Sequence, residues 1–473
     1  MSNSRRNFLK KSGIVGASLL ASSQLAAAQH EGHGQQQPQA PPKRHTPYVS
    51  GGGIVPVETP DLAKLNWTMD NDVKVFHLTA EVVKTELVPG KEMYGWGYSG
   101  SVPGPMIEVN EGDRVRLVLH NKLPEPTTIH WHGLEVPLRM DGVPFISQPL
   151  VEPGGTFTYE FTLHQNGTFF YHSHGAMQEM MGMIGLFVIH PKQPYQPHCH
   201  RDFGLILQGW ALLPNNPVPN SFAMEFNWLT INGKAGPATT PMIVKQGERV
   251  RLRVVNLGMD HHPMHIHGHQ FYVTGTEGGR VPEAAWFPGN TALVGVAQAR
   301  DLEFDAVYPG DWMFHCHLPH HMMNQMVSMV GPMAHAGHGV QTGKGMEEGM
   351  GIVRQGHALS DDMAPGFGRG MGETTEKDRN TSNLVAQGRV SQQIPSNGRK
   401  RVPGYPQDMM MILDKEVAKP HTYGLPPGWT ASMMGMMTLV RVLPPAMYDE
   451  VMRRIREGIV EAPAATPSGH KHN

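Results

Sequence analysis

The stretch Glu111-Gly112-Asp113-Arg114-Val115-Arg116-Leu117 returns about 135 positions later as Gln246-Gly247-Glu248-Arg249-Val250-Arg251-Leu252. A methionine and isoleucine pair precedes each copy, at Met106-Ile107 and at Met242-Ile243. Within the first copy, apolar residues alternate with polar ones after a Gly-containing turn signal. Such alternation is typical of an antiparallel strand with one buried face. The repeat therefore predicts an all-β chain with two homologous Greek-key β-sandwich domains.

The two copies set the domain boundaries. We place domain 1 at residues 65–191 and domain 2 at residues 203–333, joined by a Pro-rich linker that begins at Pro191. Composition assigns the flanking segments: an N-terminal arm at 29–64, a flexible linker at 334–401 and a Met-rich C-terminal segment at 402–473. We expect the last segment to form a short amphipathic helix, with Met447, Val451 and Ile455 on one face, and to dock on the domains.

The N-terminus has the features of an export signal. A twin arginine at Arg5-Arg6 precedes a short apolar stretch from Gly13 to Leu20, and small residues follow at Ala26-Ala27-Ala28. This order predicts a cleavable twin-arginine signal at residues 1–28. No other stretch has the apolar length of a membrane span. We therefore expect a periplasmic or secreted protein without a membrane span.

Composition favours metal chemistry over nucleic-acid binding. The formal net charge of the 473 residues is only -2, so no basic excess suggests a nucleic-acid partner. The chain has 28 His and 32 Met but only 2 Cys. These residues supply many soft or borderline metal ligands and no disulfide framework.

Histidine pairs keep step with the repeat. His130-Trp131-His132-Gly133 matches His265-Ile266-His267-Gly268, and Tyr171-His172-Ser173-His174 matches Phe314-His315-Cys316-His317. Residues two apart on a strand face the same side, so each His-x-His pair can present both imidazoles to one metal site. Four such clusters in register with an internal repeat predict metal binding in both domains.

Cys316 distinguishes the two copies. Its thiolate, the His321 imidazole and the Met326 thioether are the ligand types of a blue electron-transfer copper. His315 and His317 would point away from Cys316 and reach another metal. In domain 1 Ser173 takes the place of the cysteine and Gln178 that of the later histidine. We therefore expect a thiolate copper in domain 2 only.

These four motifs, over residues 65–333, resemble the four copper-binding motifs of the multicopper oxidases. The resemblance implies cupredoxin-like domains, four coppers per functional unit and reduction of dioxygen to water. It implies the following ligands: a type 1 copper on His262, Cys316, His321 and Met326; a type 2 copper on His130 and His265; and a type 3 pair on His132, His172, His174, His267, His315 and His317. Electrons would enter at the type 1 copper, through Cys316 and His321.

With blue copper only in domain 2, the chain resembles the two-domain laccase-like members. In that subgroup the cluster lies between domain 1 of one subunit and domain 2 of its neighbour in a homotrimer. The resemblance also implies that Asp141 handles protons near the cluster, although an aspartate before Gly142 is equally typical of a turn. His320 is a candidate for a second proton route. His198-Cys199-His200 repeats the tripeptide without the later ligands, and we interpret it as part of the linker.

The electron donor stays open at this point. Phenol-like donors fit a laccase, whereas Met-rich stretches such as Met433-Met434-Gly435-Met436-Met437 favour Cu(I), because thioethers prefer it. Methionine is also a flexible filler of apolar cores. Two other functions remain as alternatives: copper sequestration for copper tolerance, and a copper nitrite reductase. The complete type 1 set disfavours the first, and the eight cluster histidines disfavour the second.

Overall fold

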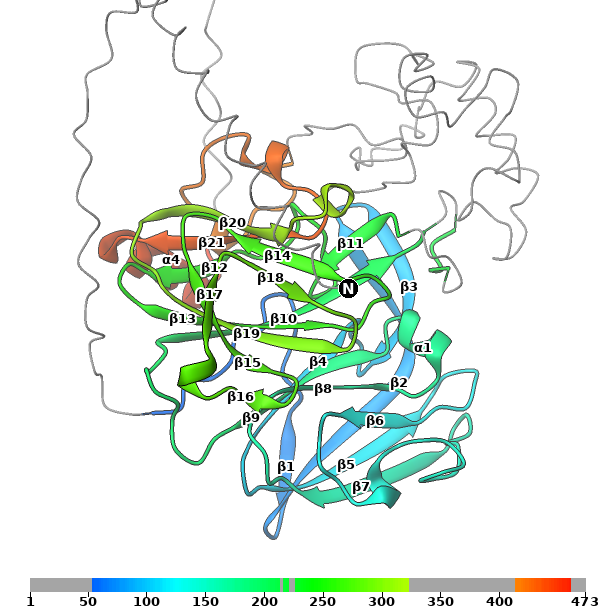
Figure 1. Ribbon diagram of the computed structural model, residues 1–473. Helices are drawn as coiled ribbons and strands as arrows, with labels where there is room; N and C mark the ends of the chain where they lie inside the picture. Colours follow the sequence, from blue (N-terminus) through cyan, green and yellow to red (C-terminus); the bar gives the residue numbers. More distant parts are fainter. Residues whose placement is uncertain (1–52, 213–215, 221–225, 323–412, 461–473) are drawn as a thin grey trace, which may run out of the picture. The chain divides into compact units, whose positions relative to one another are not determined.

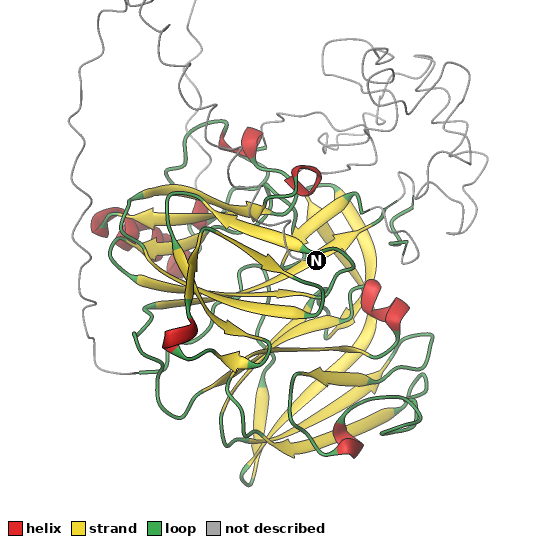
Figure 2. Ribbon diagram, in the orientation of Figure 1, coloured by secondary structure: helices red, strands yellow, loops and turns green. Residues whose placement is uncertain are grey.

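The computed structural model describes residues 53–212, 216–220, 226–322 and 413–460. The predicted signal at 1–28, the linker at 334–401 and Met326 lie outside the described residues, as does most of the N-terminal arm. Every described residue belongs to one unit, 45–473. Strands dominate it (Figure 2), which confirms the all-β fold class.

Two packed sheets form domain 1. One contains β1 (Trp67–Asp70), β2 (Val73–Val88), β5 (Arg114–Asn121) and β7 (Thr156–Thr162) in that order, with β3 (Lys91–Tyr98) also paired to β2. The other has the order β4 (Gly104–Asn110), β9 (Ile184–His190), β8 (Gly167–Ser173) and β6 (Ile129–His132). The alternating apolar residues of β5 are buried between the sheets, as the sequence predicts.

Domain 2 repeats this plan. Its larger sheet has the order β11 (Trp228–Ile231), β10 (Arg201–Trp210), β13 (Arg249–Asn256), β19 (Gln298–Asp305), β15 (Phe271–Thr276) and β16 (Gly279–Arg280), with β17 (Phe287–Gly289) paired to β15. Its smaller sheet has the order β12 (Met242–Lys245), β21 (Met437–Leu443), β20 (Gly310–Cys316), β14 (His262–Ile266) and β18 (Thr291–Val294). The fold thus places the histidine motifs of each domain on adjacent strands of its smaller sheet.

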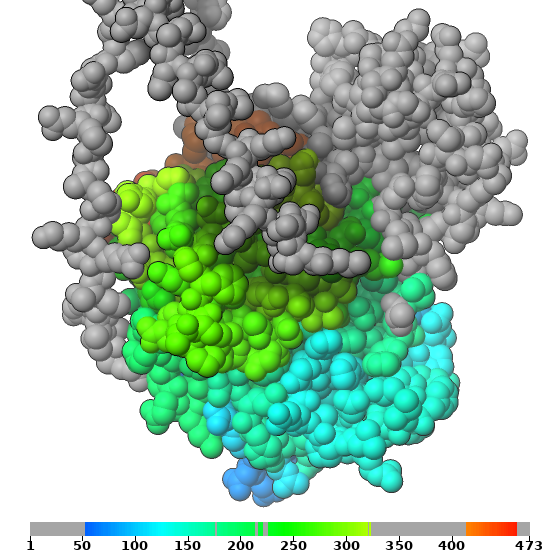
Figure 3. Space-filling model, in the orientation of Figure 1, coloured from blue at the N-terminus to red at the C-terminus, as the bar shows by residue number. Residues whose placement is uncertain are grey.

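Strand β21 comes from the segment that the sequence analysis assigns to the C-terminus. It pairs in parallel with β12 and antiparallel with β20, so the orange strand in Figure 1 lies among the green strands of domain 2. In the space-filling view, part of the orange C-terminal segment adjoins the green surface of domain 2 (Figure 3). In domain 1 the corresponding place, between β4 and β8, belongs to β9. The sheet of domain 2 therefore needs a strand from far beyond residue 333.

The described helices are short except one. They are η1 (Leu138–Met140), α1 (Ala176–Met180), η2 (Glu283–Ala285), η3 (Pro319–Met322), η5 (Pro420–Thr422), η6 (Trp429–Ser432) and α4 (Pro445–Glu457). Helix α4 follows β21 directly and packs Val451 against Ile243 of β12 and Leu443 of β21. Met447, which we expect on the same apolar face, is 37% exposed. None of the helices in the described ranges is long and apolar enough to cross a membrane.

A buried polar network joins the two domains at β8. Thr168 of β8 donates a hydrogen bond to Asp301 (2.6 Å) and accepts one from Arg253 (2.7 Å), which also contacts Asp202. Apolar contacts surround it, because Phe170 of β8 packs in one cluster with Ile206 and Val255 of domain 2. Strand β8 carries His172, so the interface fixes one strand of the histidine cluster in domain 1.

Candidate metal centres

Cys316 lies in a small buried site with two imidazoles. Its Sγ is 3.7 Å from His262 Nδ1 and 3.4 Å from His321 Nδ1, and the two Nδ1 atoms are 3.1 Å apart. All three side chains are at most 1% exposed. Strand pairing brings them together, because Met264 of β14 stands opposite Cys316 of β20, and His321 lies in η3 just beyond that strand.

This geometry fits a metal ion. In zinc sites with the same ligand types, metal–nitrogen bonds are about 2 Å and metal–sulfur bonds about 2.3 Å, which places ligand atoms roughly 3 to 4 Å apart. Burial raises the pKa of the Cys316 thiol to about 12, so it stays protonated at neutral pH until a metal displaces the proton. One thiolate and two imidazoles suit copper. The site therefore fits the predicted type 1 ligands His262, Cys316 and His321.

The histidines of domain 1 form a second cluster. His130 and His132 lie on β6, His172 lies opposite His130 on β8, and His174 follows that strand. His132 Nδ1 is 3.3 Å from His172 Nε2, and the rings of His172 and His174 are 5.3 and 5.6 Å from that of His130. One ligand atom from each of His130, His132 and His172 lies within 4.8 Å of the others.

Burial prepares these imidazoles for metal binding. It lowers the pKa of His132 to about 4, with a contribution from the nearby His172 and His130, and it also lowers the pKa of His130. Neutral imidazoles are the form that binds metal ions. At neutral pH His130 and His132 therefore offer lone pairs instead of repelling a cation.

Domain 2 presents the same arrangement on β14 and β20. His265 stands opposite His315, and His267 and His317 follow their strands. His267 Nε2 is 3.0 Å from His315 Nε2, and the ring of His265 is 4.9 to 5.6 Å from those of the other three. Burial lowers the pKa values of His267 and His315.

The two clusters stay apart within one chain. Among the described residues, no ring contact joins a histidine of the first cluster to one of the second, whereas each cluster is connected internally. His174, His267 and His317 are exposed. Each cluster, named a half-site, therefore has an open side.

Polar groups hold the outer nitrogens of several cluster histidines. His130 Nδ1 is 2.7 Å from the carbonyl oxygen of Asp141 and 3.4 Å from its carboxylate. His265 Nδ1 is 2.7 Å from the carbonyl oxygen of Asn290. Hydrogen bonds to Nδ1 fix the orientation of the ring and leave Nε2 available to a metal ion. Asp141 therefore lies beside His130, and its predicted role in proton transfer stays a prediction.

Glu179 is a residue that the sequence analysis missed. Its carboxylate is 3.1 Å from His172 Nδ1, which also contacts the carbonyl oxygen of Ser173. A carboxylate behind a ligating histidine orients the ring and increases its basicity. Glu179 lies six positions after Ser173, and Met322 lies six positions after Cys316. Only the half-site of domain 1 therefore has a carboxylate at this position.

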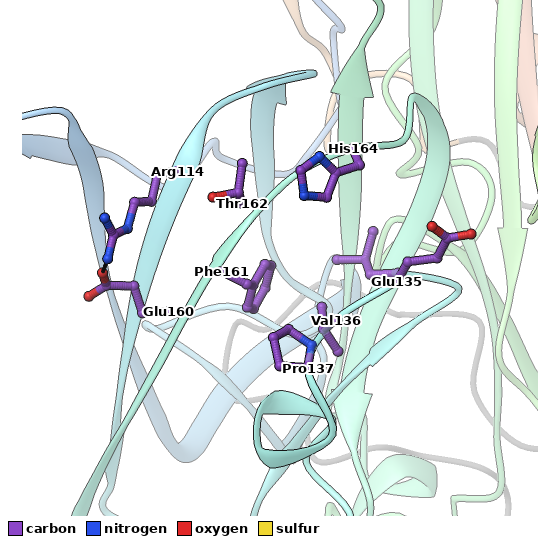
Figure 4. A pocket seen from close by; sticks show the side chains of 9 residues that line it. Arg114, Glu135, Val136, Pro137, Glu160, Phe161, Thr162 and His164 are labelled. Carbon is purple, nitrogen blue, oxygen red and sulfur yellow. Dashed lines mark ion pairs between the residues drawn. The ribbon is translucent and has the colours of Figure 1, made fainter.

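Two other features lie away from the histidine clusters. Cys199 is buried and unpaired, like Cys316, and the neighbouring His200 accepts a hydrogen bond from the backbone of Arg249. A cavity of about 810 Å³ in domain 1 is lined by residues that include Arg114, Glu160 and His164 (Figure 4). No histidine of either cluster lines this cavity. His320 lies in η3, and its side chain is outside the described part of the structure.

Comparisons with known proteins agree with this geometry. Two family models described as multicopper oxidase match residues 80–194 and 212–332. Copper resistance protein A of Pseudomonas syringae pv. tomato is 40% identical over 124 residues, which are 26% of this chain and 20% of that protein. Laccase-1 of Agaricus bisporus is 36% identical over 201 residues, 37% of this chain and 38% of that protein. The chain thus spans between a fifth and two fifths of these relatives.

Among solved structures, the blue copper oxidase from Nitrosomonas europaea matches with 33% identity and a TM-score of 0.49, over 53% of this chain and 81% of that one. The multicopper oxidase from Campylobacter jejuni, described as a metallo-oxidase, matches with 28% identity and a TM-score of 0.48, over 55% of this chain and 56% of that one.

Proposed function

Because this chain belongs to the multicopper oxidase family, we propose that it takes single electrons from a reducing substrate at the Cys316 site and reduces dioxygen to water at the histidine clusters. The supporting observation is the position of Cys316 between His315 and His317. Its thiol lies in the buried site with His262 and His321, while the flanking imidazoles belong to the other cluster. One peptide bond on each side of Cys316 thus links the two kinds of site.

We assign the ligands accordingly. His262, Cys316 and His321 would hold the type 1 copper, His130 and His265 the type 2 copper, and His132, His172, His174, His267, His315 and His317 the type 3 pair. When bound, these coppers supply one-electron transfer and the four-electron reduction of dioxygen. Burial lowers the pKa values of His130, His132, His267 and His315 and so favours their neutral, metal-binding form. Asp141 places a carboxylate beside His130 for proton transfer.

We propose that a second chain brings the two half-sites together. A head-to-tail contact between domain 1 of one copy and domain 2 of the next would join them, and such contacts close into rings. We propose a homotrimer, in which each exposed half-site is covered by its neighbour. Light scattering of the active protein tests this assembly, and a fully active monomer would contradict it.

Mixed assemblies test the shared cluster more sharply. The double variants His130→Ala/His132→Ala and His265→Ala/His267→Ala should each lack oxidase activity. If they are co-expressed with different tags and the trimers that carry both tags are isolated, about a third of the interfaces would combine two intact half-sites. Activity should therefore reappear in the mixed assembly. No recovery in a mixed assembly that contains both tags would place the cluster within one chain.

Two electron donors fit the surroundings of His321. Its Nε2 is 3.5 Å from a carboxylate oxygen of Asp260, which could accept a hydrogen bond from a phenol hydroxyl. The residue after it, Met322, packs in one cluster with Met313, Met433 and Met437, and this observation favours Cu(I) as a second candidate donor.

Dioxygen uptake with a diphenol and with Cu(I), for the wild type and for Met322→Leu, separates these donors. Selective loss of Cu(I) oxidation in the variant is expected if the thioethers receive Cu(I), and equal rates would favour the phenol. If neither donor leads to dioxygen uptake, the proposed oxidase activity is contradicted. Copper bound without turnover would then support sequestration, and consumption of nitrite would support a nitrite reductase.

We also propose export to the periplasm by the twin-arginine route, as the sequence predicts.

A further inference from the structure

The segment that lies beside Cys316 in the structure is far from it in the sequence. The Cys316 backbone N–H donates to the carbonyl oxygen of Met436 (3.0 Å), and the Met436 N–H donates to the carbonyl oxygen of His321 (2.9 Å). In domain 1 the Ser173 N–H donates to Met183 (3.1 Å), and the Met183 N–H donates to Gln178 (3.3 Å). Met436 thus makes the same backbone hydrogen bonds to Cys316 and His321 that Met183 makes to Ser173 and Gln178.

The sequences at these two places agree. Met433-Met434-Gly435-Met436 repeats Met180-Met181-Gly182-Met183 letter for letter. Both glycines have positive φ values, 64° for Gly435 and 115° for Gly182, a backbone conformation that favours glycine. The two segments are therefore equivalent turns into equivalent strands, β21 and β9. They differ in how far they lie from the preceding motif: residues 174–183 in domain 1 correspond to residues 317–436 in domain 2.

Met436 is buried in the apolar core that also contains Cys316. Its side chain is 0% exposed and belongs to the same apolar cluster as Cys316 and Met264. A thioether is the weak fourth ligand that completes a site made of two histidines and one cysteine. Met326 lies ten positions after Cys316, as Met183 does after Ser173, but in domain 2 the backbone place of Met183 is taken by Met436.

We infer that Met436, and not Met326, is the axial ligand of the Cys316 site. This inference rests on the proposed copper function of that site. It makes the blue copper a link between β14, β20 and the C-terminal strand β21, across the inserted residues 322–435. It also gives Met436 control of the reduction potential, which the axial ligand of such a site tunes.

The test uses the copper-loaded full-length protein and three leucine variants of similar volume. We expect Met436→Leu to shift the reduction potential of the blue copper upward and to alter its visible and electron paramagnetic resonance spectra. Met183→Leu, at the equivalent buried place in domain 1, is the matched control and should leave both unchanged. Met326→Leu should also leave them unchanged. The potential and spectra report the ligand directly and do not depend on turnover.

A second variant protects the test against misfolding. Met436→Gln offers an amide oxygen, a harder ligand, and should lower the potential where Met436→Leu raises it. Unchanged potentials in both Met436 variants, or a shift in Met326→Leu instead, would overturn the inference. A wild-type protein that binds copper at Cys316 without a blue band would instead refute the proposed function.

Discussion

Domain 1 and domain 2 have four structurally equivalent positions that are occupied by side chains of different chemistry. In domain 2 they hold His262, Cys316, His321 and Met436. In domain 1 they hold Thr127, Ser173, Gln178 and Met183. There Thr127 Oγ1 is 3.2 Å from Ser173 Oγ, which donates to Gln178 Oε1 (2.8 Å), and Gln178 Nε2 donates to the carbonyl oxygen of Pro126 (2.8 Å). The same backbone frame is closed by hydrogen bonds in one domain and is suited to a metal in the other.

This comparison shows that the fold supplies the geometry and the side chains decide what occupies it. A buried polar group must find a partner. In domain 1 a hydroxyl and an amide satisfy one another, so the place is complete without an ion. In domain 2 a thiol and two imidazoles stand 3.1 to 3.7 Å apart with their ligand atoms turned toward a common point. The proposed site of electron entry therefore lies in domain 2.

The largest expected effect comes from removing β21. A chain that ends after Met333 lacks the strand that pairs with both β12 and β20, including the fully buried Val440 and Val442. Each such side chain contributes about 1.5 to 3 kcal/mol, and a domain is stable by only about 5 to 15 kcal/mol. We expect loss of the folded domain 2, measured by near-ultraviolet circular dichroism. A truncated protein that keeps a native blue band would refute the place of β21 in the sheet.

The next effect is a transfer of the blue site between domains. Cys316→Ser should abolish the blue absorption and donor oxidation while copper at the histidine clusters remains. The triple variant Thr127→His/Ser173→Cys/Gln178→His, with Met183 already in place, should bind an additional copper with a thiolate absorption band. Ser173→Cys alone is the control and should show no such band. Failure of the folded triple variant to bind copper would mean that the two places differ in more than their side chains.

A repeated ion pair distinguishes the domains by burial. Arg116 pairs with Glu160 in domain 1, and Arg251 pairs with Glu303 at the equivalent register in domain 2. Glu303 is 0% exposed. Glu303→Gln removes the carboxylate that Arg251, Arg249 and Arg280 share, although Arg251 keeps Asp202 and Arg249 keeps Asp305. Because this buried positive charge is then under-compensated, the free energy of unfolding should fall by about 3 to 5 kcal/mol. Glu160→Gln should cost far less, because solvent screens that pair. If urea unfolding gives the same loss of stability for both variants, the proposed difference between the buried and the exposed ion pair is contradicted.

The same pair predicts a pH dependence for domain 2. Burial raises the pKa of Glu303, but Arg251, Arg280 and Arg249 lower it more, to about 2. Because the folded value lies below the ordinary 4.5, the stabilisation is present above pH 4.5 and is lost as the pH falls toward 2. The Glu303→Gln variant should therefore lose less stability than the wild type over that range. Parallel losses in acid unfolding would count against this origin.

The smallest effect concerns the carboxylate that only one half-site has. Glu179→Gln should lower dioxygen-dependent turnover about tenfold, because it weakens the support of His172. Oxygen uptake and bound copper should be measured together. Unchanged turnover at full copper content would show that the support of His172 by Glu179 does not matter for the reaction.

Sequence reasoning predicted the sandwich domains and the histidine clusters because both depend on short, in-register motifs. It could not place β21, since residues 317–436 separate that strand from its neighbour, although the repeated Met-Met-Gly-Met was a usable signal. It missed the burial of Arg251 and Arg253, because β5 and β13 have nearly the same letters and differ in what covers them. Glu179 lies outside every motif, and only the fold brings it to His172.

The most direct test of the account is the number of coppers and electrons in the wild-type protein. Copper content, blue absorption and dioxygen consumption should be measured on one copper-loaded sample. We predict four coppers per chain, of which one is blue, and one dioxygen consumed for every four electrons taken from the donor. One blue copper with a single further copper and no dioxygen uptake would contradict the account.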